Sequence, residues 1–195
     1  MIVATEKRSR RLKEVIAKRQ PDLTVVMENI HDPHNVSAML RSCDAAGVMQ
    51  VQLVYSKEEF PGIGKKSSAS AGKWIALRKF RTAAECAATL RKEGFTICAT
   101  QLEARSDSLY ELDLTGKVAL VFGNEHRGVS DEFAKVADHN FQIPMFGMIR
   151  SLNVSVACAV TLFEAVRQRM AHGDYETPKL SAQELNALLK QWNGH

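Results

Sequence analysis

The chain has 195 residues and a formal net charge of +4, with 45% hydrophobic and 25% charged residues. This composition is typical of a soluble globular domain with a sizeable core, with or without small terminal additions. It contains no apolar run long enough to span a membrane and no signal peptide, so we expect a cytoplasmic protein.

The segment 1–20 contains seven Lys or Arg residues and two Glu residues, whereas the rest of the chain is nearly neutral. Residues 5–20 are predicted to form a helix with an apolar face that includes Leu12 and Ile16, ended by Pro21. A basic helix on a near-neutral body is typical of an arm that binds phosphates, although a solvated helix face has the same pattern.

The chain then alternates short apolar strands with amphipathic helices. Strands are predicted at residues 23–27, 51–55, 74–77, 95–100 and 118–122. Helices are predicted at residues 36–46, 83–92, from about 130, 153–171 and 181–192. This alternation predicts an α/β fold, with a mostly parallel sheet covered by helices on both faces. The most strongly apolar strand, 118–122, is expected at its centre.

Residues that suggest other functions are scarce. His31 and His34 flank Pro33 without a third ligand nearby, so we expect a loop there and no metal site. The Gly-, Ser- and Lys-rich segment 56–73 is predicted to be an exposed loop whose lysines contact a polyanion. The cysteines have no C-x-x-C spacing, which favours buried, reduced thiols over a disulfide framework or a zinc site. They are Cys43, Cys86, Cys98 and Cys158.

Three loops, after Thr100, Phe122 and Ile143, follow predicted strands, and ligands of α/β folds bind beyond the carboxyl ends of the strands. The loop 123–128 reads G-x-E-x-x-G, which is neither a dinucleotide fingerprint nor a P-loop. Its Glu125 suits a cationic group or an arginine better than a phosphate.

The stretch 143–157 passes from a strand end through Pro144 and Gly147 into a helix. Ser151 and Asn153 stand where that helix begins, beside free backbone N–H groups. A glycine-containing turn that ends on a helix N-terminus is a common ligand site, although an ordinary capped loop has the same pattern.

Arg41 follows Asn35 by six residues, near the apolar face of the helix 36–46. An arginine in such a place either pairs with an acid or binds a phosphate with its planar guanidinium.

Three separated motifs together resemble the SpoU branch of the SPOUT RNA methyltransferases. They are Asn35-x5-Arg41, Gly123-x-Glu125-x-x-Gly128 and the run I-P-M-x-G-x-x-x-S-L-N-V-S-V-A at residues 143–157. The likeness covers nearly the whole chain. The runs 19–25 and 33–38 are similar, more narrowly, to members that methylate the 2′-oxygen of guanosine 18 in the tRNA D-loop.

The resemblance implies a deep trefoil knot near the C-terminus, bound S-adenosylmethionine, a homodimer with its site at the subunit interface, and tRNA rather than DNA or a membrane as partner. It implies three parts: a basic helix for RNA at 1–20, the knotted domain at 21–173 and a C-terminal helix at 174–195. The helices 153–171 and 181–192 are the candidate dimer contacts.

The resemblance also implies the roles of individual residues. The catalytic set would be Arg41, Asn35, Glu125, Ser151 and Asn153. The cofactor would be bound around Thr100, Gly123, Ile143, Met148 and Leu152. The RNA contacts on the basic helix would be Lys7, Arg8, Arg11 and Arg19.

Some features depart from the family or leave alternatives. Arg150 stands where close relatives are expected to have Gln, and the pair His126-Arg127 has no clear counterpart. A ribosomal RNA substrate is the first alternative, but ribosomal members often carry a separate N-terminal RNA-binding domain, for which the first 20 residues leave no room. The second is a non-catalytic RNA-binding module. The joint presence of four residues argues against it: Arg41, Glu125, Ser151 and Asn153.

Overall fold

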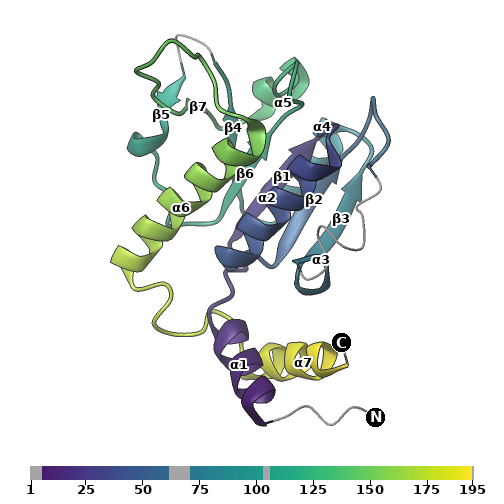
Figure 1. Ribbon diagram of the computed structural model, residues 1–195, viewed down its shortest axis with the longest axis vertical. Helices are drawn as coiled ribbons and strands as arrows, with labels where there is room; N and C mark the ends of the chain where they lie inside the picture. Colours follow the sequence, from purple (N-terminus) through teal and green to yellow (C-terminus); the bar gives the residue numbers. More distant parts are fainter. Residues whose placement is uncertain (1–5, 62–70, 103–105, 195) are drawn as a thin grey trace.

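Seven parallel strands form one sheet in the computed structural model, which describes residues 6–61, 71–102 and 106–194 (Figure 1). The strands are β1 (Leu23–Glu28), β2 (Gln50–Val54), β3 (Ala76–Phe80), β4 (Thr96–Thr100), β5 (Asp107–Ser108), β6 (Val118–Phe122) and β7 (His139–Gln142). Their order is β3-β2-β1-β6-β4-β7-β5, and every pairing is parallel. The predicted α/β class and the central place of 118–122 are therefore confirmed.

Seven helices accompany the sheet in the part of the chain that the structure describes. They are α1 (Glu6–Ala17), α2 (Pro33–Ala45), α3 (Ala71–Trp74), α4 (Ala83–Lys92), α5 (Asp131–Val136), α6 (Val154–His172) and α7 (Ala182–Asn193), with a 3-10 turn at Leu109–Glu111. The α2–α6 pair covers one face and the α4–α5 pair the other (Figure 1). On β6, Leu120 and Phe122 point into the core under α2 and α6, whereas Ala119 and Val121 belong to the second core. This alternation is what a strand buried on both faces requires.

Helices α1 and α7 pack together at the end of the molecule that lies away from the carboxyl ends of the strands (Figure 1). Leu12 and Ile16 of α1 form a buried apolar cluster with Trp192 of α7. A capping box between Ser181 and Glu184 begins α7. The apolar stripe of α7 therefore packs against α1.

The bounds of several elements differ from the prediction, and helix α1, expected at 5–20, ends at Ala17. The strand expected at 74–77 begins two residues later, at Ala76, because Trp74 ends α3 and its ring lies 4.8 Å from that of Trp192. Helix α2 begins three residues early, because Asp32 caps it and Pro33 supplies its first turn. The two-residue strand β5 was not predicted. The lysines Lys65 and Lys66 lie outside the described residues.

All four cysteines are buried and unpaired, as expected. None of the described helices is long and apolar enough to cross a membrane.

Candidate active site

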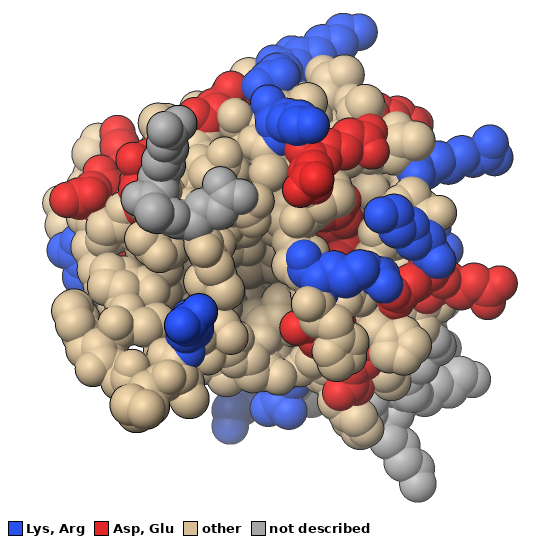
Figure 2. All heavy atoms as spheres, turned by 90° about the horizontal axis from the view of Figure 1, so that it is seen from above, with Lys and Arg blue, Asp and Glu red and all other residues tan. Residues whose placement is uncertain are grey.

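A cavity of about 550 Å³ opens at the carboxyl ends of β4, β6 and β7. Its walls come from the three loops that leave these strands and from the first turn of α6. Figure 2 shows the molecule from this end, with a hollow that has Lys and Arg side chains on either side of it. The cavity lies where parallel sheets bind their ligands. Its volume falls within the range of small-molecule sites.

The loop after β6 owes its shape to Gly123 and Asn124. A Cβ on Gly123 would lie 2.1 Å from backbone atoms of Gly128, so no other residue fits there without moving the loop. The loop closes on itself through a hydrogen bond of 2.8 Å from the Gly128 N–H to the Asn124 carbonyl. The Asn124 side chain donates to the Asn29 carbonyl at 2.8 Å and fixes the loop against the end of β1. This fold aims Glu125 at the segment before α2.

Glu125 is the acceptor for three donors at the start of α2. Its carboxylate accepts hydrogen bonds from the backbone N–H groups of His31 (3.0 Å) and Asp32 (3.1 Å) and from the Asn35 side chain (2.9 Å). Burial raises the pKa of Glu125, but these hydrogen bonds outweigh it and keep the pKa below its ordinary value. The expected cationic partner of Glu125 is thus replaced, within the described residues, by neutral donors.

Asn35 links this carboxylate to α6. Its side-chain oxygen accepts a hydrogen bond of 3.1 Å from Asn153. Asn153 also caps α6, since its own oxygen accepts from the Ser155 N–H at 2.9 Å. The three motifs that are far apart in the sequence therefore meet in one chain of hydrogen bonds, Asn153–Asn35–Glu125, at one side of the cavity.

The other predicted site residues divide between the cavity and the surface. Ser151 lines the cavity, as do four of the five predicted cofactor residues, Thr100, Gly123, Ile143 and Leu152. Thr100 is bound within the sheet, because its hydroxyl donates to the Val121 carbonyl at 3.1 Å. Met148 does not line the cavity and its side chain is fully exposed.

Arg41 stands apart from the cavity of its own chain. It lies on α2 with an exposed side chain and has no hydrogen bond or ion pair with any residue that the structure describes. Asn35 on the same helix reaches the cavity only through Glu125 and Asn153. One chain therefore brings together four of the five predicted catalytic residues and leaves Arg41 outside.

The predicted RNA contact Arg19 is wrong, because Arg19 is buried at 1% exposure. It pairs with Asp44 at 2.5 Å, donates to the Val48 carbonyl and lies 5.0 Å from the centre of the Trp192 ring. These contacts attach α1 to the body and to α7. Lys7 and Arg11 are exposed on α1, while Arg8 is half-buried.

The sequence assigns no role to two side chains that interact beside the cavity, Glu58 and Arg127. Glu58 lies in the segment after β2 and contacts His31, Asn124 and Arg127. Arg127 was noted only as an unmatched residue. Nothing local distinguishes Glu58 from Glu59, since only the folded chain brings one of them to Arg127.

Comparisons with known proteins agree with this geometry. The family model described as the SpoU rRNA methylase family matches residues 22–163. The chain is 45% identical over 188 residues to a tRNA (guanosine(18)-2′-O)-methyltransferase of Thermus thermophilus, covering 96% of each chain. The crystal structure of the A. aeolicus TrmH/SpoU tRNA modifying enzyme superposes with a TM-score of 0.90 at 41% identity, over 96% of this chain and 95% of that one. An AdoMet-bound rRNA methyltransferase from Sinorhizobium meliloti is similar at a TM-score of 0.66 and 28% identity, over 80% of this chain and 59% of that one.

Proposed function

The chain belongs to the SpoU rRNA methylase family, and we propose that it transfers a methyl group from S-adenosylmethionine to the ribose 2′-oxygen of guanosine 18 in the D-loop of tRNA. One observation of the structure carries this proposal. The hydrogen-bonded residues Asn153, Asn35 and Glu125 stand beside a cavity of cofactor size at the carboxyl ends of the strands. The chain resembles its tRNA-modifying relative over almost the whole length of both proteins.

The cavity suits S-adenosylmethionine in size and in chemistry. Leu102, Ile143 and Leu152 give it an apolar wall for an aromatic base. Polar groups of Gln101, Ser151 and Asn153 line it too, and the guanidinium of Arg150 suits a carboxylate. Of the five residues assigned to the cofactor, we retain Thr100, Gly123, Ile143 and Leu152 as contacts in the cavity. Met148 is proposed as a contact made only when the exposed segment 146–149 closes over the ligand.

The bound cofactor supplies a methyl group on a positively charged sulfur, which already activates that carbon for displacement. The protein has to align the ribose oxygen behind the methyl group and stabilise the oxygen as it loses its proton. Arg41 stays protonated in proteins and is therefore a poor base. In our proposal Arg41 binds a substrate phosphate or the developing alkoxide, and a phosphate oxygen or water takes the proton.

The other proposed catalytic residues orient the nucleotide. Glu125 is held as a carboxylate by its three donors, so it serves as a fixed acceptor and not as an acid. Asn35 and Asn153 have amide groups that tie Glu125 to the first turn of α6. Ser151 offers its hydroxyl to the substrate from the cavity wall.

A homodimer explains how Arg41 reaches a cavity. Three exposed apolar side chains on α6, Val156, Phe163 and Met170, are spaced seven residues apart and so form one stripe. We propose that this stripe packs against a second copy, whose Arg41 completes the site. Light scattering should then give twice the chain mass of 21.7 kDa.

The domain organisation is proposed on the family resemblance. Residues 1–20 form the basic arm, residues 21–173 form a domain with the trefoil knot of the family, and residues 174–195 form the C-terminal helix that packs on the arm. A tRNA substrate is consistent with a cytoplasmic location and gives no reason to expect a DNA or membrane partner.

Ribosomal RNA is the second candidate substrate, because the S. meliloti protein with AdoMet bound is named an rRNA methyltransferase. The substrate is decided by incubating the protein with S-adenosylmethionine and unmodified tRNA transcript or ribosomal RNA, followed by nuclease digestion and mass spectrometry. A methyl group on the ribose of guanosine 18 is the expected result. Methylation of ribosomal RNA alone selects the second candidate, and binding without methylation of either RNA selects a non-catalytic module.

A further inference from the structure

The carboxylate of Glu58 contacts three groups, and two of them belong to Asn124 and Arg127, which line the cavity. Its oxygens lie 3.1 Å from His31 Nδ1 and accept hydrogen bonds from the Asn124 side chain at 3.2 Å and from the Arg127 guanidinium. The Glu58 side chain is only 20% exposed. A carboxylate with so little water around it needs fixed partners, and Arg127 is the one with a permanent charge.

Arg127 is held by its backbone and by one nitrogen of its guanidinium, while the rest of the guanidinium is exposed. Its backbone N–H donates to Asn124 at 3.3 Å, and one terminal nitrogen of its guanidinium donates to Glu58. The side chain is 55% exposed. A guanidinium has five N–H donors, and no other partner for them is found among the described residues. One edge of the fork is therefore anchored while the other faces solvent.

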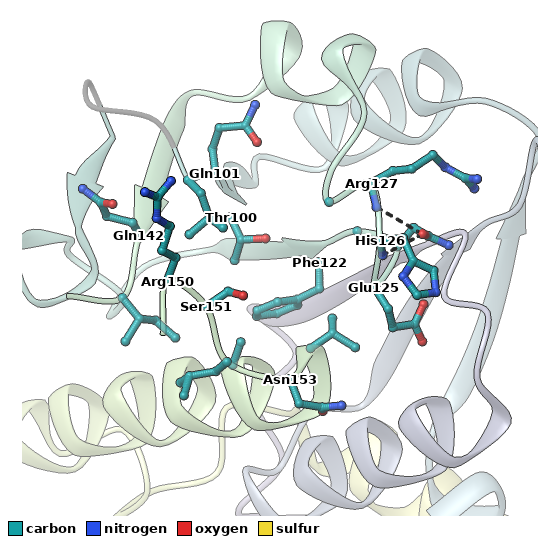
Figure 3. Close-up of a pocket in the computed structure, with 18 of the residues that line it drawn as sticks. Thr100, Gln101, Phe122, Glu125, His126, Arg127, Gln142, Arg150, Ser151 and Asn153 are labelled. Atoms are coloured by element: carbon teal, nitrogen blue, oxygen red, sulfur yellow. Dashed lines mark hydrogen bonds between the residues drawn. The ribbon is translucent and has the colours of Figure 1, made fainter. Parts of the chain in front are cut away.

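The position of this guanidinium matters for the substrate. Arg127 lines the cavity, and Figure 3 shows Arg127 and His126 on one side of it and Arg150 on the opposite side. The target ribose has to reach the cofactor that is proposed to fill this cavity, and a phosphate stands on each side of that ribose, so the RNA backbone would pass along this rim. Glu125, the nearest acid on the same loop, is occupied by neutral donors and offers Arg127 no competing ion pair.

We propose that Arg127 binds a phosphate next to the target nucleotide of the RNA, and that Glu58 is the positioning residue that orients it. This rests on the proposed function, because an RNA substrate supplies the phosphate. An arginine whose orientation is already fixed loses less side-chain entropy on binding. Its planar fork can also donate hydrogen bonds to two phosphate oxygens at once.

A purely structural role for Arg127 is the alternative. In that case the guanidinium would only neutralise Glu58, and its loss would harm RNA binding by leaving an unpaired negative charge at the rim. Phosphate binding and neutralisation of Glu58 predict opposite effects on RNA binding when the Glu58 carboxylate is removed together with Arg127. The variant Glu58→Gln/Arg127→Ala lacks the cation and the unpaired charge together.

The experiment compares Arg127→Ala, Glu58→Gln and the double variant with the wild type. The readouts are KM and kcat for tRNA methylation, the salt dependence of tRNA binding, and S-adenosylmethionine affinity. Arg78→Ala is the matched control, because Arg78 pairs with Glu93 at 2.7 Å, is 37% exposed and does not line the cavity.

We expect Arg127→Ala to raise KM about tenfold, to lower kcat less than about twofold and to make the salt slope shallower by about 1, as the loss of one phosphate contact requires. Glu58→Gln should raise KM about threefold, since the guanidinium remains but is no longer oriented. Cofactor affinity and the Arg78→Ala control should stay at wild-type values.

The double variant should keep the raised KM and the shallower slope of Arg127→Ala. A return of the double variant to wild-type values would overturn the proposal and leave Arg127 as a neutralising partner of Glu58. An unchanged KM in Arg127→Ala would also overturn it. The proposed function fails separately, if the wild type methylates no tRNA. The salt slopes of tRNA binding still test Arg127 in that case.

Discussion

At the scale of single residues, Glu125 controls the geometry of the site. It replaces water as the acceptor for two backbone N–H groups before α2 and for the Asn35 amide. A carboxylate in this role must stay ionised, and the hydrogen bonds that lower its pKa ensure this. The same contacts make Glu125 a source of stability as well as part of the proposed active site.

Because the pKa of Glu125 is lowered on folding, its contribution to stability is present above its unfolded-state pKa and is lost as pH falls through the folded-state pKa. We expect Glu125→Gln to lower the free energy of unfolding by about 1–3 kcal/mol at pH 7. The difference from wild type should shrink toward pH 3. Urea unfolding at both pH values measures it.

Glu14→Gln is the control for this variant, since Glu14 is exposed on α1 and pairs only with Arg11. Its effect should stay within about 0.5 kcal/mol at either pH. An undiminished difference between Glu125→Gln and wild type in acid would contradict the assigned role of the carboxylate.

The sequence predicts individual residues well where the signal is local and poorly where a distant partner decides. The capping roles of Asn153 and Ser181 follow from their place before a helix. Arg19, by contrast, looks like its basic neighbours on α1, and only the folded chain brings Asp44 and Trp192 to it. The link from Glu125 to Asn35 likewise joins residues 90 positions apart.

At the scale of elements, α6 is fixed at both ends. Asn153 attaches its first turn to the site, and Arg169 attaches its last turn to the start of β1. Arg169 is fully buried and donates to the Asp22 carboxylate at 2.6 Å, to the Gln20 side chain at 3.0 Å and to the carbonyls of Leu114 and Gly116. This charge is needed for the position of the whole helix.

We expect Arg169→Met to lower the free energy of unfolding by about 3–5 kcal/mol, because it leaves buried acceptors and the Asp22 carboxylate without their main donor. Arg167→Met, two residues earlier on α6, is the matched control. Arg167 also pairs with an acid, Glu164, but the Arg167 side chain is 68% exposed and Gln168 donates to the same carboxylate, so the loss of Arg167 should lower the free energy of unfolding much less. Equal losses in urea unfolding would refute the structural role of Arg169.

Helix α1 also has a predicted function at this scale. Lys7 and Arg11 are its exposed candidates for phosphate contacts, and Arg19 is excluded by its burial. The double variant Lys7→Gln/Arg11→Gln should weaken tRNA binding and make its salt slope shallower by about 2, with cofactor affinity unchanged. Lys92→Gln, which removes an exposed charge from α4, is the control. A slope equal to that of wild type would leave α1 as a solvated helix.

The sequence predicts the order of the elements, but it predicts their exact bounds only in part. Helix α4 was predicted to the residue, because Thr82 caps it and Gly94 follows it at a positive φ of 85°. The apolar run at Trp74 suggests a strand, but packing against Trp192 places that residue in α3. Strand β5 has only two residues and depends on its neighbour β7, so its own sequence carries no signal.

At the scale of the whole molecule, a single chain does not bring the whole proposed catalytic set together. Arg41 is exposed and lines no part of its own cavity, and the basic helix α1 lies at the far end of the molecule from that cavity (Figure 1). The apolar stripe on α6 runs beside the helix that bears Arg41. In the proposed homodimer a second copy docks on this stripe, and each chain supplies Arg41 to the cavity of its partner.

Subunit complementation tests this arrangement. We expect Arg41→Ala and Asn153→Ala to be inactive in tRNA methylation when each is assayed alone, while Arg41→Ala still binds S-adenosylmethionine. When the two variants are unfolded together in equal amounts and refolded, half of the dimers are mixed, and each mixed dimer has one cavity with an intact Asn153 and an intact Arg41 from its partner. About a quarter of the wild-type activity should therefore return. If Arg41 acts in its own chain, every cavity in the mixture lacks one of the two residues and no activity returns, whatever the oligomeric state.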